Sequence, residues 1–341
     1  MKRCLSLVAL LSLAGPAAAL DTEVNLSGKF GLSLSYFNSN DAAPGSLTDV
    51  DVENNGSNFR VSASAQEGGI NTFIAYERGA SNDQLGVEDV REFFGGISGS
   101  VGTLIYGRKA TDYRIAGARL DPFYNTSVAG FSGGFASEGA SYGLSNLTNG
   151  YTANTISVHS PVAGGFSGNL AAYINENDNL TSTGDKADYG LGVSYANSDW
   201  LGLDVGAQML DLNDSSQRPV TNSLGDGNAY RLHASIAEKL WAVGLSYEIV
   251  DVKAEQNPRN YAFLSATYQI SEKWRLAAAA GHETDTPTAD GTGLTFGAFH
   301  DLTRNFSYYV AGRYVTLDDA ADTKKATLAT GVKFVFETDI K

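Results

Sequence analysis

The chain has 341 residues and a formal net charge of −14, with 38 acidic and 24 basic side chains. This acidic excess argues against nucleic acid as a partner, because phosphate backbones are bound by basic patches. The single cysteine, Cys4, lies in a predicted export signal, so we expect no disulfide and no thiol chemistry in the mature chain.

Residues 1–19 are predicted to be a secretory signal peptide. Two basic residues precede a short apolar run, Leu5–Leu13, and three alanines, Ala17–Ala19, form a small-residue cleavage site. The apolar run is too short to span a bilayer. We therefore expect the mature chain to begin at Leu20 and, having lost two basic residues, to carry a charge of about −16.

The first mature segment alternates almost without error between apolar and polar side chains. A period of two indicates a β-strand with one apolar and one polar face. No apolar run of about 18 residues occurs elsewhere, so only strands could cross a membrane. The apolar face comprises Val24, Leu26, Phe30, Leu32, Leu34 and Tyr36.

Similar alternation recurs to the end of the chain and predicts sixteen strands. Very short connections alternate with longer polar ones such as 38–56, 176–187 and 212–227. This rhythm is typical of a transmembrane barrel with short periplasmic turns and long extracellular loops. The predicted strands are 23–37, 57–67, 70–78, 89–98, 103–109, 152–160, 166–175, 188–197, 201–211, 228–238, 241–251, 259–270, 274–283, 292–301, 306–316 and 325–336.

In the second half, an aromatic residue follows each of several short polar turns and opens the next strand. Aromatic side chains at one height on successive hairpins are expected where a barrel crosses a membrane interface. Strand-end aromatics of a soluble β-protein are the alternative. The predicted periplasmic girdle consists of Trp200, Trp241, Trp274 and Phe306.

Residues 110–151 contain no clean strand, and a structureless stretch of this length in a compact domain is usually functional. The segment is too apolar for a free surface tail, since it contains Phe123, Val128, Phe131 and Tyr142. We predict that it folds back inside the barrel.

The segment that enters this loop, Arg91–Arg108, reads REFFGGISGSVGTLIYGR. It resembles the general porins of Gram-negative outer membranes, most closely those of alphaproteobacteria, which carry an arginine, an aromatic–glycine pair and Gly-x-x-Gly-x-Leu-x-x-Gly-Arg before their third loop. The segment Gly331–Phe336 is similar to their last strand. Five residues follow Phe336 here, whereas the family normally ends at that aromatic.

The resemblance implies a homotrimer of sixteen-stranded barrels in the outer membrane, in contact with lipid and lipopolysaccharide. It also implies that the third loop, about 110–151, narrows each pore and presents acids to a wall of arginines. Alternation independently directs Arg60 to the lumen, between Phe59 and Val61. The wall arginines carried over are Arg60, Arg91 and Arg108.

The acidic candidates on the loop are Asp121, Asp112 and Glu138. The family often supplies a further wall arginine at the start of strand six, where this chain has residues 151–154, Tyr-Thr-Ala-Asn. The arginine cluster is therefore thinner, or it is refilled by Arg114 or Arg119 from the loop.

Alternation assigns further basic residues to the lumen. Together with loop acids they would set a field across the constriction, and selectivity would follow from charge and bore. The alternative is that each base pairs with a carboxylate and holds the loop. These residues are Lys29, Arg231, His233, Arg275, Arg313 and Lys333.

Many acids lie in the predicted loops, among them Asp49, Asp51, Glu53, Asp318, Asp319 and Asp322. We read them as a solvated rim, or as sites where Ca²⁺ or Mg²⁺ bridges carboxylates to anionic headgroups. The four histidines have no metal-ligand spacing, and no catalytic constellation stands out. No cofactor and no enzymatic activity are expected.

These observations predict an all-β outer-membrane channel for passive diffusion of ions and small hydrophilic solutes. An acidic rim favours cations slightly. One alternative is a porin selective for a sugar or organic anion, for which Tyr261, Phe263 and Tyr309 could line the lumen. Another is a secreted all-β adhesin or binding module with polar outer faces.

Overall fold

The computed structural model describes residues 21–40, 47–80, 90–131, 142–174, 187–198, 202–212, 226–286 and 289–340. The predicted signal peptide lies outside these ranges. None of the helices described there is long and apolar enough to cross a membrane. The helices are α2 (Asp112–Ala118) and the 3₁₀ helix η1 (Asn146–Asn149). The strands are β1 (Asp21–Ser39), β2 (Leu47–Asn54), β3 (Asn58–Glu67), β4 (Ile70–Gly79), β5 (Val90–Gly99), β6 (Gly102–Ala110), β7 (Tyr151–His159), β8 (Phe166–Ile174), β9 (Ala187–Asn197), β10 (Leu203–Leu212), β11 (Gly227–Ala237), β12 (Trp241–Val252), β13 (Arg259–Gln269), β14 (Trp274–Thr284), β15 (Asp290–Asp301), β16 (Phe306–Asp318) and β17 (Lys324–Ile340).

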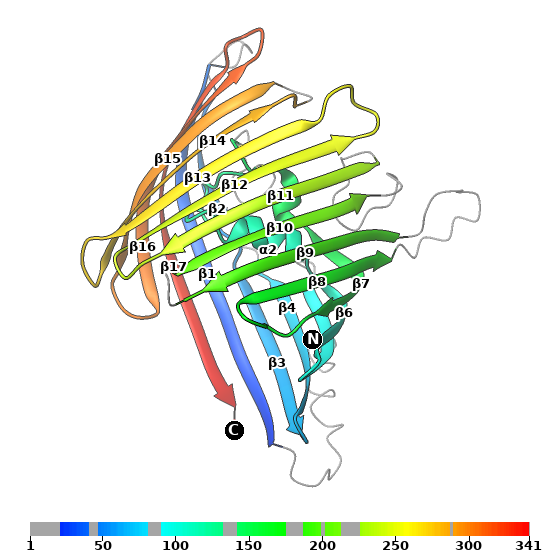
Figure 1. Ribbon diagram of the computed structural model, residues 1–341. Coiled ribbons are helices and arrows are strands. Elements are labelled where there is room, and N and C mark those ends of the chain that lie inside the picture. Colours follow the sequence, from blue (N-terminus) through cyan, green and yellow to red (C-terminus); the bar gives the residue numbers. More distant parts are fainter. Residues whose placement is uncertain are drawn as a thin grey trace, which may run out of the picture.

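The strands form one closed antiparallel sheet (Figure 1). Successive strands pair with each other, and β1 closes the sheet against β17 from Val24–Ile340 to Ser39–Lys325. On its other side β1 pairs with both β2 and β3, which are two halves of a single barrel strand. The barrel therefore has sixteen strands, as the sequence predicts.

The prediction that residues 38–56 form a loop is wrong, because part of this segment forms β2, the first half of the second barrel strand. Residues 47–54 pair with Leu32–Ser39 as β2, and an irregular segment at 55–57 separates β2 from β3. Val50 and Val52 face outward and alternate with Asp51 and Glu53. The acids give this strand the composition of a polar loop, which explains the error.

The last strand runs past Phe336 to Ile340. Its final residues pair with Val24–Ser27 on β1. The Asn25 side-chain amide donates hydrogen bonds to Glu337 Oε1 (3.1 Å) and Asp339 Oδ1 (3.2 Å). The residues beyond the family's usual end therefore lengthen the seam that closes the barrel.

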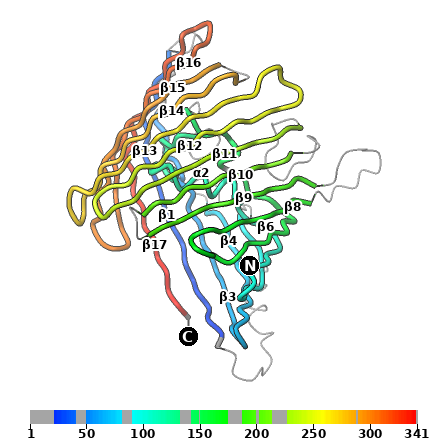
Figure 2. The backbone as a smooth tube through the Cα atoms, viewed as in Figure 1, coloured from blue at the N-terminus to red at the C-terminus, as the bar shows by residue number. Residues whose placement is uncertain are grey.

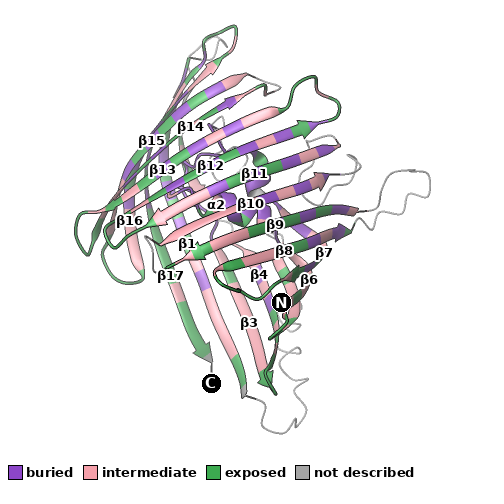
Figure 3. Ribbon diagram, viewed as in Figure 1, coloured by how far each residue is buried: buried purple, intermediate pink, exposed green. Residues whose placement is uncertain are grey.

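Exposed residues alternate with more buried ones along the strands (Figure 3). Many of the exposed residues are large and apolar, whereas the inward-facing ones include many polar side chains. On β12 and β13, Leu245 and Leu264 are about half exposed on the outside, whereas Ser246 is 1% exposed on the inside. The apolar outer wall is what a hydrocarbon environment requires, and closure pairs the backbone groups that lipid could not satisfy.

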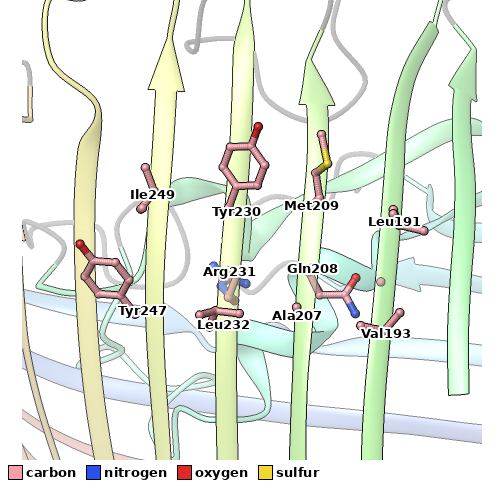
Figure 4. A pocket seen from close by; sticks show the side chains of 11 residues that line it. Leu191, Val193, Ala207, Gln208, Met209, Tyr230, Arg231, Leu232, Tyr247 and Ile249 are labelled. Carbon is pink, nitrogen blue, oxygen red and sulfur yellow. The ribbon is translucent and has the colours of Figure 1, made fainter. Parts of the chain in front are cut away.

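A close view of β9–β12 shows two apolar rows on this outer wall (Figure 4). Between them runs a shallow groove of about 390 Å³. Arg231 lies on the opposite side of β11 from its neighbours Tyr230 and Leu232 (Figure 4). The rows are Leu191–Met209–Tyr230–Ile249 and Val193–Ala207–Leu232–Tyr247.

The aromatic residues expected at the short-turn end open alternate strands. Trp241 begins β12, Trp274 begins β14 and Phe306 begins β16. Trp241 lies opposite Tyr268, and the ring of Trp274 packs on His300 at 4.3 Å. Trp200 lies outside the described residues. The common position of Trp241, Trp274 and Phe306 at short turns is consistent with the girdle, which stays a prediction.

The segment between β6 and β7, here called the inner loop (residues 111–150, described over 111–131 and 142–150), lies inside the barrel (Figures 1 and 2). It carries α2 and η1. Most of its described apolar side chains are buried against inward-facing wall residues such as Phe263 and Tyr309, whereas Ile115 is exposed. The loop members of this cluster include Phe123, Val128, Phe131 and Tyr142. The core of the molecule thus lies in the lumen, between loop and wall.

We expect a charge on the outer wall to destabilise the barrel according to its depth. Leu264 lies at the middle of β13, and Tyr268 is equally exposed near the short-turn end. Leu264→Arg should lower the free energy of unfolding by about 2–4 kcal/mol, and Tyr268→Arg by about 0–1 kcal/mol. Reversible urea unfolding from lipid vesicles measures both. Equal losses for the two variants would contradict the assigned depths of the two residues in the membrane.

Candidate pore constriction

The inner loop turns into the lumen directly after β6. Thr111 caps α2 by accepting a hydrogen bond from the Arg114 backbone N–H on Oγ1 (3.0 Å). Asp112, the first residue of the helix, forms a salt bridge with Lys109 of β6 (3.2 Å) and lies 3.6 Å from His159 of β7. Asp112 therefore fixes the start of the loop rather than facing the wall arginines.

A fully buried ion pair anchors the helix to the wall. Arg231 on β11 and Glu248 on β12 are paired at 2.9 Å, with both side chains inaccessible to solvent. Arg231 donates to the Tyr113 carbonyl (2.6 Å) and to Thr148 Oγ1 (2.8 Å). Glu248 accepts from the Tyr113 hydroxyl (2.7 Å) and from the Ser145 N–H (3.2 Å). We call these five residues the wall latch.

For Arg231 the wall latch agrees with the alternative given above, in which a lumen base pairs with a carboxylate and holds the loop in place. Its carboxylate comes from the neighbouring strand and not from the loop, which supplies Tyr113, Ser145 and Thr148 instead. Arg313 plays a related part, since its Nη1 donates to the Ala129 carbonyl (3.1 Å). Alternation had directed both arginines inward correctly, but their cations are occupied beneath the loop.

Asp121 does not face the arginine wall, contrary to the expectation from the resemblance. Its two carboxylate oxygens accept the backbone N–H groups of Phe123 (2.8 Å) and Gly130 (2.7 Å), and the residue is buried. Burial raises the pKa of this loop carboxyl to about 6, although the two N–H donors oppose that shift. Asp121 therefore holds the loop's own fold.

Two of the predicted wall arginines meet two carboxylates. Arg60 Nη1 donates to Glu92 (2.7 Å) and lies 3.6 Å from Glu77, while Arg91 lies 3.4 Å from Glu77. The β4–β5 register shifts between Glu77 and Arg78, so that Arg91 is left without a partner in the ladder. This irregularity lets both Arg91 and Glu92 reach lumen partners, and it explains why alternation could not assign Arg91.

Arg114 of α2 packs against Tyr151, the first residue of β7. Its guanidinium lies 3.7 Å from the ring centre of Tyr151, and its Nε donates to the Tyr124 hydroxyl (3.0 Å). Arg91 also donates to the Tyr151 hydroxyl (2.6 Å). Arg119, the other candidate, pairs with Asp204 on β10 instead.

Lys29 joins this group from β1. Its ammonium donates to the Asn125 side-chain carbonyl (2.7 Å) on the loop. Arg91, Arg114 and Lys333 act electrostatically on Lys29, with Glu77 as an opposing carboxylate. The wall facing the inner loop thus carries Lys29, Arg60 and Arg91 against Glu77 and Glu92, and Arg114 lies beside them on the loop.

Arg108 does not belong to this cluster. It lies opposite Phe93, whose ring is half exposed on the outer face, and its Nε donates to the Val90 carbonyl (2.7 Å). The β6–β7 register shifts between Gly107 and Lys109, and Lys109 is the residue that faces inward. Glu138 lies outside the described residues.

Arg275 and Lys333 line the lumen on strands β14 and β17. The guanidinium of Arg275 lies 4.4 Å from the ring centre of Phe299. Both residues border a cavity beside the inner loop, together with Asp301. Within the described residues, no salt bridge involves Lys29, Arg114, Arg275 or Lys333.

The sequence analysis missed Glu248, Glu77 and Glu92 as partners of its basic residues. Alternation places Glu248 on the inner face of its strand, and it could have placed Glu77 there in the same way, since both follow the period of their strands. It could not reveal which cation each would meet, because that depends on the register between strands and on the path of the loop.

The model of the Gram-negative porin family matches residues 6–320 of the sequence. A search of curated proteins finds no match. Among solved structures, the chain is similar to an anion-selective porin from Comamonas acidovorans, with 18% identity, a TM-score of 0.76 and coverage of 93% of this chain and 100% of that one.

Two further porin structures are similar at lower scores. The trimer form of OmpT from Vibrio cholerae has 14% identity, a TM-score of 0.65 and coverage of 92% of this chain and 99% of its own. OmpF of Salmonella typhi, solved with daunomycin, has 15% identity, a TM-score of 0.63 and coverage of 92% and 97%. At these identities the likeness shows the shared barrel fold.

We expect the wall latch to dominate the stability of the loop. Glu248→Ala leaves the Arg231 cation buried without its partner, which should lower the free energy of unfolding by about 3–5 kcal/mol. The control is Glu255→Ala, which breaks the partly exposed Arg259–Glu255 pair and should cost about 1 kcal/mol or less. Urea unfolding measures both variants, and single-channel current noise should rise only for Glu248→Ala. Equal effects would contradict the latch.

Proposed function

Because the chain belongs to the Gram-negative porin family, we propose that three copies assemble into a homotrimer and that the constriction of each barrel favours anions. The chain forms an outer-membrane channel through which solutes diffuse passively. Each barrel in the proposed trimer is an independent pore for ions and small hydrophilic molecules. The proposal includes no catalytic step.

The trimer is supported by comparison and by the outer wall. A porin of similar fold from Vibrio cholerae has been solved in a trimer form. The apolar outer face can pack against lipid or against a second copy of the chain, because both present hydrocarbon surfaces. The remaining outer wall contacts lipid and lipopolysaccharide.

One observation supports the anion preference: basic side chains outnumber carboxylates where β1, β3 and β5 face the inner loop. Lys29, Arg60 and Arg91 share two carboxylates there, and Arg114 adds a further positive charge buried against Tyr151. The described loop acids Asp112 and Asp121 are engaged elsewhere. In a narrow, low-dielectric passage, fixed charge of one sign concentrates ions of the other sign. The similar Comamonas porin is described as anion-selective.

This proposal reverses the slight cation preference suggested by the acidic rim. Rim carboxylates lie in bulk water, where salt at about 0.1–0.15 M screens their interaction with ions over a distance of about 8–10 Å. Charges at the constriction act on an ion that has already lost part of its hydration, so they should determine the sign. We keep as part of the proposal that Ca²⁺ or Mg²⁺ bridges rim acids such as Asp318 and Asp322 to anionic headgroups.

The two alternatives from the sequence find less support. The aromatic residues considered for a sugar-selective pore do not form a free ladder, because Tyr261, Phe263 and Tyr309 are at most 6% exposed. Phe263 and Tyr309 form the floor on which the inner loop packs. A soluble adhesin would need polar outer faces, whereas the outer faces of this barrel are apolar.

The proposal is tested by the reversal potential of the purified protein in a planar bilayer under a KCl gradient. We expect steps that arrive in threes and a potential whose sign corresponds to anion preference. Lys29→Gln should reduce that preference by removing one unpaired cation, whereas Lys324→Gln at the rim should leave it unchanged. A cation-selective potential would contradict the assignment, and single independent steps would contradict the trimer.

A further inference from the structure

A cavity of about 190 Å³ lies between the inner loop and strands β14–β17. Strand register builds its wall from two adjacent inward-facing rows. The first row is Arg275, Phe299 and Tyr309, and the second is Asp301, Ser307 and Lys333. The loop closes the other side with Asp121, Pro122, Tyr124, Asn125 and Thr126.

The charged groups of the cavity are arranged asymmetrically. Arg275 and Lys333 both border it, and neither forms a salt bridge with a described residue. Asp301 is exposed at the same border and acts electrostatically on both cations. Asp121 also lines the cavity, but both of its oxygens accept loop N–H groups. The open positions around the cavity therefore carry two cations and one carboxylate.

The Arg275 guanidinium is held in a fixed orientation. It stacks over the Phe299 ring at 4.4 Å, and Phe299 is itself packed against Tyr309 (5.7 Å) and Phe123 (5.7 Å). A planar guanidinium with a supported orientation matches a carboxylate in a two-point contact. Lys333 supplies a second charge from the neighbouring row.

The size of the cavity limits the ligand. An engineered protein cavity of about 150 Å³ holds one benzene molecule, so about 190 Å³ accommodates one ring together with a small polar group. The aromatic edges of Phe299 and Tyr309 offer an apolar contact, while Asn125, Thr126 and Ser307 offer polar ones. The nearby Asp301 carboxylate disfavours a second negative charge on the ligand.

We infer that this cavity is a subsite for small single-ring monocarboxylates, whose carboxylate binds between Arg275 and Lys333. The inference rests on the proposed diffusion channel and adds to it a class of solute that is retained on its way through the lumen. A monocarboxylate of this size pauses beside the constriction, so it lowers the ionic current while it is bound.

The test uses the purified full-length mature protein in a planar bilayer with sodium benzoate as the probe. Acetate is the control for charge without a ring, and benzyl alcohol is the control for a ring without charge. We expect benzoate to reduce single-channel current in a saturable manner, and acetate and benzyl alcohol to have little effect at the same concentrations.

The variants Arg275→Gln and Lys333→Gln should each raise the half-blocking benzoate concentration roughly tenfold, because each removes a charged hydrogen-bond donor. Asp301→Asn should lower it, since a repelling charge is lost. Lys324→Gln is the matched control on β17, at a rim lysine paired with Asp322 (2.7 Å). Lys333 and Asp301 are exposed, so their variants remain informative if Arg275→Gln fails to fold.

Open channels that benzoate and acetate affect alike, or a half-blocking concentration unchanged in Lys333→Gln and Asp301→Asn, would overturn the subsite and leave the diffusion channel intact. An absence of channels from folded protein would instead overturn the proposed function itself.

Discussion

The pairing of every backbone polar group within a closed sheet is the constraint on which the rest of this structure depends. Hydrocarbon offers no partner for an open strand edge, so the first and last strands must meet. Here they meet along most of β1, and the residues after Phe336 extend that seam to Ile340. Closure then sorts side chains by a period of two, with apolar groups outward and a lumen wide enough to hold a loop.

The inner loop turns this wide lumen into a selective passage. Its apolar side chains replace the hydrophobic core that a barrel of sixteen strands otherwise lacks. Its polar anchors are wall residues, above all Arg231 and Glu248, whose charges cancel in a dry site. Because Arg231 is neutralised beneath the loop, the electrostatics of the open passage depends on the less buried cations Lys29, Arg60 and Arg91. Different residues therefore hold the loop, such as Arg231 and Glu248, and face the solute, such as Lys29.

Features imposed by the alternation between lipid and water could be predicted from the sequence, and features decided by register could not. The strand count, the inward loop and the lumen position of Arg60 follow from periodicity and composition. Arg91 and Arg108 lie at irregularities in the ladder, where the period of two fails. Glu248 shows its inner face in the sequence, but its partner is fixed only when β11 and β12 align. Asp121 looked like a pore acid because backbone donors leave no trace in a sequence.

The central claim, that the barrel has an apolar outside and a water-filled lumen, is tested most directly by comparing cysteine reactivity on the two faces of one strand. The mature chain is predicted to have no thiol of its own, so only the introduced cysteine can react. On β17, Lys333→Cys lies on the exposed inner face and Leu328→Cys on the outer face. In protein reconstituted into lipid vesicles, a charged, water-soluble thiol reagent should modify the cysteine at 333 rapidly and the cysteine at 328 hardly at all. Rapid reaction at 328 with protection at 333 would contradict a barrel with an apolar outside and a water-filled lumen.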